Sequence, residues 1–195
     1  MPWETKFNID SAIDKAIHVF WTKGYKSTSL SDLLDAMKIN KGSFYNTFGS
    51  KKTLFKIALQ QYETDYLHGL FTQLSKLDDP VDSIIGLFSL FIQQRSDDSE
   101  KSQKGCLLVN TVMDLENHDD DIKHQVIKGI DKVEHFFQEQ IKLGIAQGKV
   151  RESIDIKSTS RTLLTLAGGC RVLAKGVRDE SEMEVIKSHV LSLLK

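Results

Sequence analysis

The chain contains few residues that break helices or cross-link loops. Its 195 residues include two prolines and two cysteines. Pro2 is terminal, and Pro80 stands where a helix can begin, because proline is tolerated in a first helical turn. Long helices are therefore permitted along nearly the whole chain. Two cysteines, Cys106 and Cys170, are too few for a disulfide framework and suit a reducing compartment.

Signals for membranes and secretion are also missing. No run reaches the roughly 18 to 20 apolar residues that a membrane-spanning helix needs. The N-terminus lacks the basic-then-apolar plan of a signal peptide. We therefore expect a cytoplasmic protein with no membrane partner, and the 40% of apolar residues is enough for a substantial core.

Motifs of catalysis and cofactor binding are absent as well. The sequence has no glycine-rich phosphate loop, GxSxG, HExxH or paired-cysteine zinc spacing, so we expect no catalytic residues, no metal and no cofactor. His118 and His124 lie beside an acidic stretch, 119–121, which favours a helix start with solvated histidines over a metal site. A cysteine-dependent enzyme using Cys106, and a helical protein-interaction module, remain as alternative functions.

Charge is divided unevenly along the chain. The formal net charge is −1, but residues 1–56 hold nine lysines and five acidic residues, a net +4, and the remainder is −5. A basic N-terminal part can neutralise phosphates, while an acidic remainder discourages non-specific binding to nucleic acid. The division is compatible with a nucleic-acid partner.

Residues 29–51 predict two short helices joined by a turn of about three residues. Ser29 and Asp32 have the spacing of a capping box, and Asn40 can cap a second helix whose Phe44 and Phe48 point inward. The first helix carries an apolar stripe at helical spacing: Leu30, Leu33, Leu34 and Met37. This geometry is typical of the helix-turn-helix, whose second helix enters the major groove of DNA.

The outer face of this unit carries polar groups that can contact phosphates and base edges. Lys41 supplies charge, and Gly42 has no side chain to hold a phosphate away from the helix N-terminus, which binds anions. A solvated face on a small helical hairpin is the alternative. The residues we predict to contact DNA are Ser29, Ser31, Lys41, Gly42, Ser43, Tyr45, Asn46 and Lys51.

The stretch GYKSTSLSDLLDAMKINKGSFYNTFGSKKTLF resembles the DNA-binding motif of the TetR family of bacterial transcriptional regulators. The pattern positions are Gly24, Tyr25, Ser29, Lys41, Gly42, Phe44, Tyr45, Phe48, Lys51 and Leu54. The chain departs from the pattern at Lys38, where a small residue is usual, and at Asn40, where serine is frequent. The resemblance implies a homodimeric repressor that binds a palindromic double-stranded operator and responds to a small molecule.

The rest of the sequence predicts an all-α fold of about nine helices. A three-helix helix-turn-helix domain over 1–50 is followed by a helical effector-binding and dimerisation domain over 51–195. Residues 95–104 are polar and without periodicity, so we expect a loop there. Helices are predicted at 9–23, 51–74, 80–95, 105–115, 120–147, 156–177 and 181–194.

The last two predicted helices have generous apolar surfaces. Gly168 and Gly169 would let another helix approach closely, and the resemblance implies that this pair forms a four-helix bundle with its copy in a second subunit. A helix-turn-helix monomer offers few contacts to hold a site, so we favour the dimer. The alternative is that both helices only cover the core of a monomer.

Aromatic and branched residues in the C-terminal part exceed what a cover needs, which predicts an effector cavity. An ordinary core is the alternative for each residue. The predicted wall residues are Phe88, Phe91, Met113, Phe137 and Leu166.

Cys106 is the predicted sensor of electrophiles or oxidants. It follows Gly105 at an expected helix start, where backbone N–H groups stabilise a thiolate, and Lys104 adds positive charge. Gly105-Cys106-Leu107, taken with Ala174-Lys175, also resembles the electrophile-responsive branch of TetR-like repressors, which implies Lys175 as a possible partner of the cysteine. A packing role for a small cysteine is the alternative.

Overall fold

The computed structural model describes residues 7–93, 106–173 and 181–195; the side chains of 91–93 and 181–183 are not described. Within these ranges every regular element is helical, which confirms the predicted all-α class. None of these helices is both long and apolar enough to span a membrane. The elements are α1 (Ile9–Lys23), α2 (Leu30–Met37), α3 (Lys41–Phe48), α4 (Lys51–Gln61), a π-helical segment (Tyr62–His68), α5 (Gly69–Leu74), α6 (Pro80–Gln93), α7 (Leu107–Val112), a 3-10 turn (Leu115–Asn117), α8 (Asp120–Ala146), α9 (Ile156–Leu173) and α10 (Ser181–Leu194).

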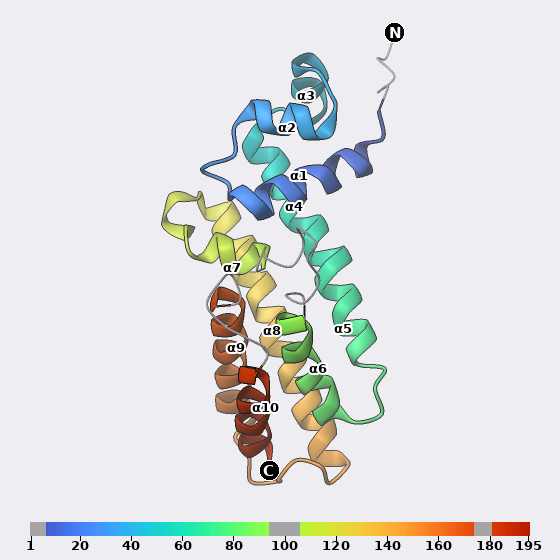
Figure 1. The fold of residues 1–195 in the computed structure, drawn as a ribbon, viewed down its shortest axis with the longest axis vertical. Helices are drawn as coiled ribbons and strands as arrows, with labels where there is room; N and C mark the ends of the chain where they lie inside the picture. The colour runs from blue at the N-terminus through green and yellow to red at the C-terminus, as the bar shows by residue number, and fades with distance from the viewer. Residues whose placement is uncertain (1–6, 94–105, 174–180) are drawn as a thin grey trace.

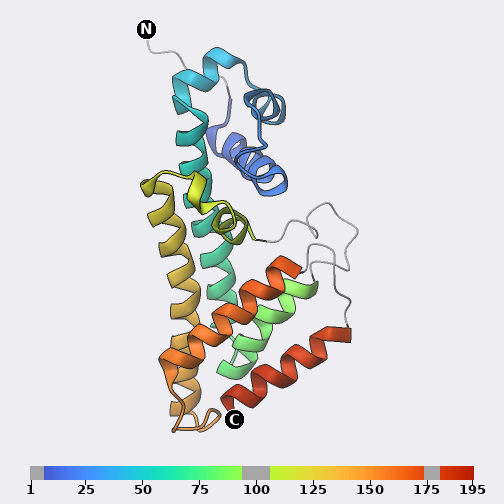
Figure 2. The same ribbon diagram turned by 90° about the vertical axis from the view of Figure 1, so that its left-hand side faces the viewer.

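The molecule is elongated, with α1 to α3 gathered at one end (Figure 1). We call these three helices the head and the remaining helices the body. The long helix α8 runs down the body beside the rod that α4, the π segment and α5 form together, and α9 and α10 lie obliquely across it (Figure 2). Because that rod is continuous, the described chain contains nine helical rods, as predicted. The predicted loop at 95–104 lies outside the described residues.

Side-chain caps fix where the helices of the head begin. The Ser29 hydroxyl accepts from the Asp32 backbone N–H at 3.1 Å, and Asp32 accepts from the Ser29 N–H at 2.8 Å, which confirms the capping box. Asn40 Oδ1 accepts from the Ser43 N–H at 2.8 Å and caps α3. Between the two helices Lys38 adopts a left-handed conformation, with φ of 58°. A glycine would adopt it without steric cost, which explains why a small residue is usual there.

Two apolar cores hold the helices together. The first joins the head to α4, α7 and the start of α8, and the second lies deeper in the body among α6, α8, α9 and α10. Phe71 of α5 packs against both cores. The first core therefore crosses the predicted boundary after residue 50, and that boundary stays a prediction.

The rod from Lys51 to Leu74 is not a uniform α-helix, contrary to the prediction. Residues Tyr62–His68 are π-helical. Tyr62 is almost fully buried within this segment, and its ring stacks on that of Tyr66 at 5.3 Å between centroids. π segments in helices often mark functional sites. Here the segment lies where the head meets the body.

Candidate nucleic-acid interface and internal cavity

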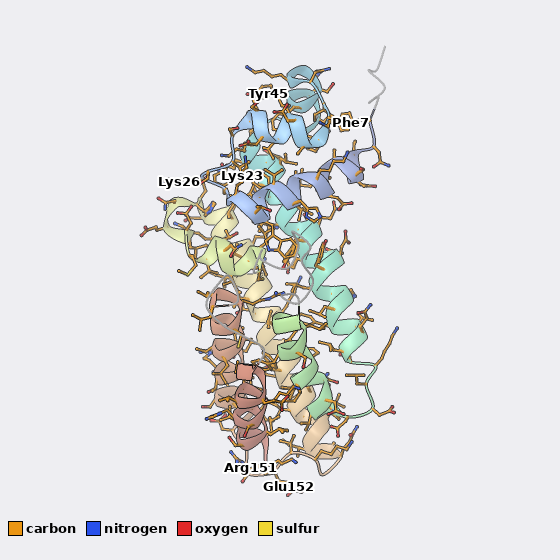
Figure 3. The ribbon with its side chains drawn as sticks, in the orientation of Figure 1. Phe7, Lys23, Lys26, Tyr45, Arg151 and Glu152 are labelled. Atoms are coloured by element: carbon orange, nitrogen blue, oxygen red, sulfur yellow. The ribbon has the colours of Figure 1, made fainter. Side chains whose placement is uncertain are left out.

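The outer face of α3 is polar and exposed. Phe44 and Phe48 are buried as predicted, while Lys41, Gly42 and Asn46 are exposed. Tyr45 is 47% exposed and lies at the end of the molecule farthest from the body (Figure 3). An ammonium, a phenol and an amide on one short helix can donate to phosphates and base edges.

The serines predicted to contact DNA are engaged in local bonds. The Ser29 hydroxyl donates to Asp32 at 2.8 Å, and the Ser31 hydroxyl donates to Asp35 at 3.4 Å. The Ser43 backbone N–H is taken by the Asn40 cap, and the Ser43 side chain is half-buried. DNA contact by these three residues stays a prediction, and their visible role is to fix the two helices.

Asp32 anchors α2 by charge as well as by capping. Lys23 of α1 donates to its carboxylate at 2.6 Å, and this bond with the two from Ser29 lowers the pKa of Asp32 to about 2. A carboxyl group with a lowered pKa stabilises the folded state above its unfolded pKa and loses that contribution as the pH falls through the folded value. The α1–α2 contact is therefore maintained at neutral pH and lost only in strong acid.

Lys51 holds the loop between α1 and α2 rather than extending into solvent. Its Nζ donates to the backbone carbonyls of Tyr25 at 2.8 Å and Thr28 at 2.6 Å, and lies 4.4 Å from the centre of the Tyr25 ring. Partial burial lowers the pKa of Lys51. Its predicted phosphate contact stays untested, and the structure adds a structural role that the sequence did not reveal.

A cavity of about 300 Å³ opens in the body between α7, α8 and α9. We call it the body cavity. Its walls are mainly apolar, and Arg171, itself buried, is the charged side chain among the described residues that line it. The lining residues are Leu67, Cys106, Leu108, Val109, Val112, Met113, Ile130, Val133, Leu164, Ala167, Gly168, Arg171 and Val172.

The predicted wall residues are only partly those of the body cavity. Met113 lines it, but Phe88 and Phe137 belong to the second core, fully buried with ring centroids 6.0 Å apart. Leu166 is on the exposed surface of α9 instead. The Phe91 side chain and Lys175 lie outside what the structure describes. Most of the predicted aromatic bulk therefore fills the core.

Cys106 caps α7 and lines the body cavity. It is 8% exposed, and the Tyr62 hydroxyl donates to its Sγ at 3.5 Å. Burial raises the pKa of Tyr62 well above its usual value, so the phenol keeps the proton with which it donates. The Tyr62 ring also meets the Trp21 ring of α1 edge-on, with centroids 5.0 Å apart. Three residues thus connect the cavity to the head.

Tyr62 and Trp21 were not predicted as parts of a site. Asn110 of α7 donates to the Trp21 carbonyl at 3.3 Å, a second contact between body and head. No local pattern distinguishes these residues from packing aromatics, since their partners are distant in sequence. The four-residue spacing of Tyr62 and Tyr66 was the one available signal, and it indicated only a buried face.

The histidines beside the acidic stretch are not both solvated, which corrects the prediction for His118. His118 is 5% exposed and stacks on Phe55, with ring centroids 5.5 Å apart. Burial lowers its pKa. His124 is exposed. Among the described residues, no group of three or more histidine, cysteine, aspartate or glutamate side chains could hold a metal ion.

We expect Lys51→Ala to lower the free energy of unfolding by about 1.5 kcal/mol, because the Tyr25 and Thr28 carbonyls lose a charged donor. Lys52→Ala is the matched control. Lys52 forms an exposed ion pair with Asp119, so its loss should cost well under about 1 kcal/mol. Urea unfolding of both variants measures the difference, and equal losses would show that Lys51 does not hold the loop.

Comparison with known proteins agrees with this geometry. Residues 12–57 match the family model described as bacterial regulatory proteins, tetR family, and residues 80–190 match the model of the tetracyclin repressor-like C-terminal domain. The HTH-type transcriptional repressor ComR of Escherichia coli K12 is 26% identical over 180 residues, covering 92% of this chain and 85% of ComR. These matches include both the head and the body.

Solved structures show the same fold. A cysteine mutant of the TetR-family regulator CifR, in complex with a 26-base-pair operator duplex, superposes with a TM-score of 0.81 at 23% identity, over 97% of each chain. The reduced form of Escherichia coli NemR superposes with a TM-score of 0.84 at 21% identity, over 98% of each chain. The chain therefore belongs to the TetR family, and it is a DNA-binding transcriptional regulator rather than an enzyme.

Proposed function

We propose that this regulator is a cytoplasmic repressor that binds a palindromic operator as a homodimer and leaves it when an apolar electrophile or an oxidant reacts with Cys106. The observation that carries the proposal is the position of Cys106 in the wall of the body cavity, in contact with Tyr62. The domain division at residue 50 and Lys175 as a partner of the cysteine are parts of the same proposal.

The surroundings of Cys106 favour reaction at this thiol. A hydrogen bond from a neutral phenol stabilises a thiolate, and the thiolate is the nucleophile. The apolar walls favour entry of an apolar molecule. Addition to an activated double bond forms an S–C bond and breaks the carbon–carbon π bond, and a proton passes to the neighbouring carbon.

A change at Cys106 can reach the head through few contacts. An adduct at Sγ displaces the Tyr62 hydroxyl, and the Tyr62 ring packs edge-on against Trp21 of α1. A tilt of α1 moves α3, because both share the first core. Repression is then lost when the two heads of a dimer no longer match the spacing of the half-sites.

The names of two structural neighbours fit this proposal. CifR was solved as a cysteine mutant bound to operator DNA, and NemR in a form called reduced. Both names describe those proteins, and at 23% and 21% identity they support a cysteine-based response in this chain only as a hypothesis.

The proposed dimer uses α9 and α10. Thr162, Thr165, Leu166, Gly169 and Val172 are exposed on α9, and at 100° per residue all lie within about 60° of Gly169. An added Cβ at Gly169 meets nothing within 4 Å in the protomer. A second copy of the helix could therefore approach closely along this stripe, burying Leu166 and Val172.

Lys41→Ala should weaken operator binding and reduce the slope of log affinity against log salt by about one unit per protomer, since one phosphate contact is lost. Lys128→Ala, which removes an exposed lysine from α8, is the control. Gel shifts at several salt concentrations measure the slope. A Lys41→Ala protein with the wild-type slope would exclude this phosphate contact.

N-ethylmaleimide should release wild-type protein from operator DNA and leave Cys106→Ser bound. Cys170→Ser retains Cys106 and should behave like the wild type. Fluorescence anisotropy of a labelled operator follows release, and mass spectrometry identifies the modified cysteine. If Cys106→Ser is released as readily as the wild type, Cys106 is not the sensor, although the assignment as a regulator remains.

Gly169→Trp should convert the dimer to a monomer and weaken operator binding at least about tenfold, while leaving the protomer folded. Gly69→Trp is a matched control, because Gly69 is also helical with nothing within 4 Å of an added Cβ, but lies on α5. Light scattering after gel filtration gives the mass. A dimeric Gly169→Trp protein would refute this interface.

A further inference from the structure

A second cavity lies at the junction of head and body, apart from Cys106. It has a volume of about 260 Å³, and we call it the junction cavity. A cavity of about 150 Å³ is enough to hold benzene. Its lining residues are Phe20, Lys23, Gly24, Tyr25, Lys26, Ser27, Phe55, Leu107, Asn110, Thr111, Asp114 and His118.

Aromatic rings form one part of this lining. The His118 ring lies 5.0 Å from that of Tyr25 and 5.5 Å from that of Phe55, centroid to centroid. Phe20 packs edge-on against Phe55 at 4.8 Å. These faces can accept a flat ring, because offset and edge-to-face ring contacts are favourable.

His118 also offers the cavity a polar atom. Within the described part of the chain, its Nδ1 is buried and has no hydrogen-bond partner. Such an atom is expensive to leave unpaired, since buried polar groups in folded proteins are nearly always bonded. A ligand hydroxyl could form this bond, because either tautomer of a neutral imidazole can pair with it.

The charged residues around the junction cavity favour an anion. Lys23 and Lys26 lie beside each other at the end of α1, next to the segment that links α7 and α8 (Figure 3). Lys23 is paired with Asp32, whereas Lys26 is exposed. Asp114 is the carboxylate in the lining, and the Asn117 amide donates to it.

We propose that the junction cavity is a second effector site that takes small hydroxylated aromatic carboxylates. The ring packs on the aromatic wall, the hydroxyl pairs with Nδ1 of His118, and the carboxylate lies near Lys26. This site does not require reaction at Cys106. A molecule held there contacts the α1–α2 loop and α7 together, so it fixes the angle of the head and changes operator affinity.

The test compares three probes by isothermal titration calorimetry: 4-hydroxybenzoate, benzoate and phenol. Wild-type protein should bind 4-hydroxybenzoate best, because benzoate lacks the hydroxyl and phenol lacks the carboxylate. His118→Phe keeps a stacked ring and removes Nδ1. It should weaken 4-hydroxybenzoate at least about tenfold and leave benzoate unchanged.

Lys26→Ala should weaken both carboxylates at least about tenfold and leave phenol unchanged. Two exposed residues of α8 provide controls, His124→Phe and Lys128→Ala, and both should bind all three probes like the wild type. Thermal unfolding confirms that each variant is folded. In the wild type, 4-hydroxybenzoate should also perturb the imidazole resonances of His118.

The proposal is overturned if 4-hydroxybenzoate shows no saturable binding up to about 10 mM, or if it binds His118→Phe and Lys26→Ala as tightly as the wild type. Operator affinity with and without 4-hydroxybenzoate is measured in Cys106→Ser as well. A response there supports a site independent of the thiol. Loss of the response with Cys106→Ser would instead assign the effect to the body cavity and refute the junction site.

Discussion

The contact between Phe20 of α1 and Phe55 of α4 is the interaction on which the orientation of the head depends. The rings meet edge-on at 4.8 Å, and both residues are almost fully buried. About fifty residues bury too little surface to be stable alone, so the head completes its core with α4, α7 and α8. Any signal in the body that displaces α4 or α7 therefore also moves the head.

Local features of the sequence predicted the helices well. Ser29 and Asn40 are caps whose partners lie three residues away, and Gly24 and Gly148 adopt the positive φ that ends a helix. These signals act within one helical turn, and the hydrophobic spacing adds the buried face. The head could be predicted nearly completely because its motif consists of such short-range signals.

The site residues were predicted less well because their partners are distant in sequence. Lys51 bonds to carbonyls 26 and 23 residues earlier, so its sequence position suggests only an exposed lysine at a helix start. His118 has a polar, acidic neighbourhood in sequence but an aromatic one in space. Phe88 and Phe137 show the opposite limit: apolar spacing identifies burial but does not distinguish a core from a cavity wall.

The π segment has a consequence for the phase of the rod. A π turn contains more residues than an α turn, so α5 is rotated relative to its position in an uninterrupted helix. α4 then presents Leu54 and Leu59 to the first core, while α5 presents Leu74 to the second. Deleting one residue between Leu59 and Leu74 would turn everything beyond it by about 100°. The angular offset between the two cores is therefore fixed by the number of residues in this segment as much as by their identity.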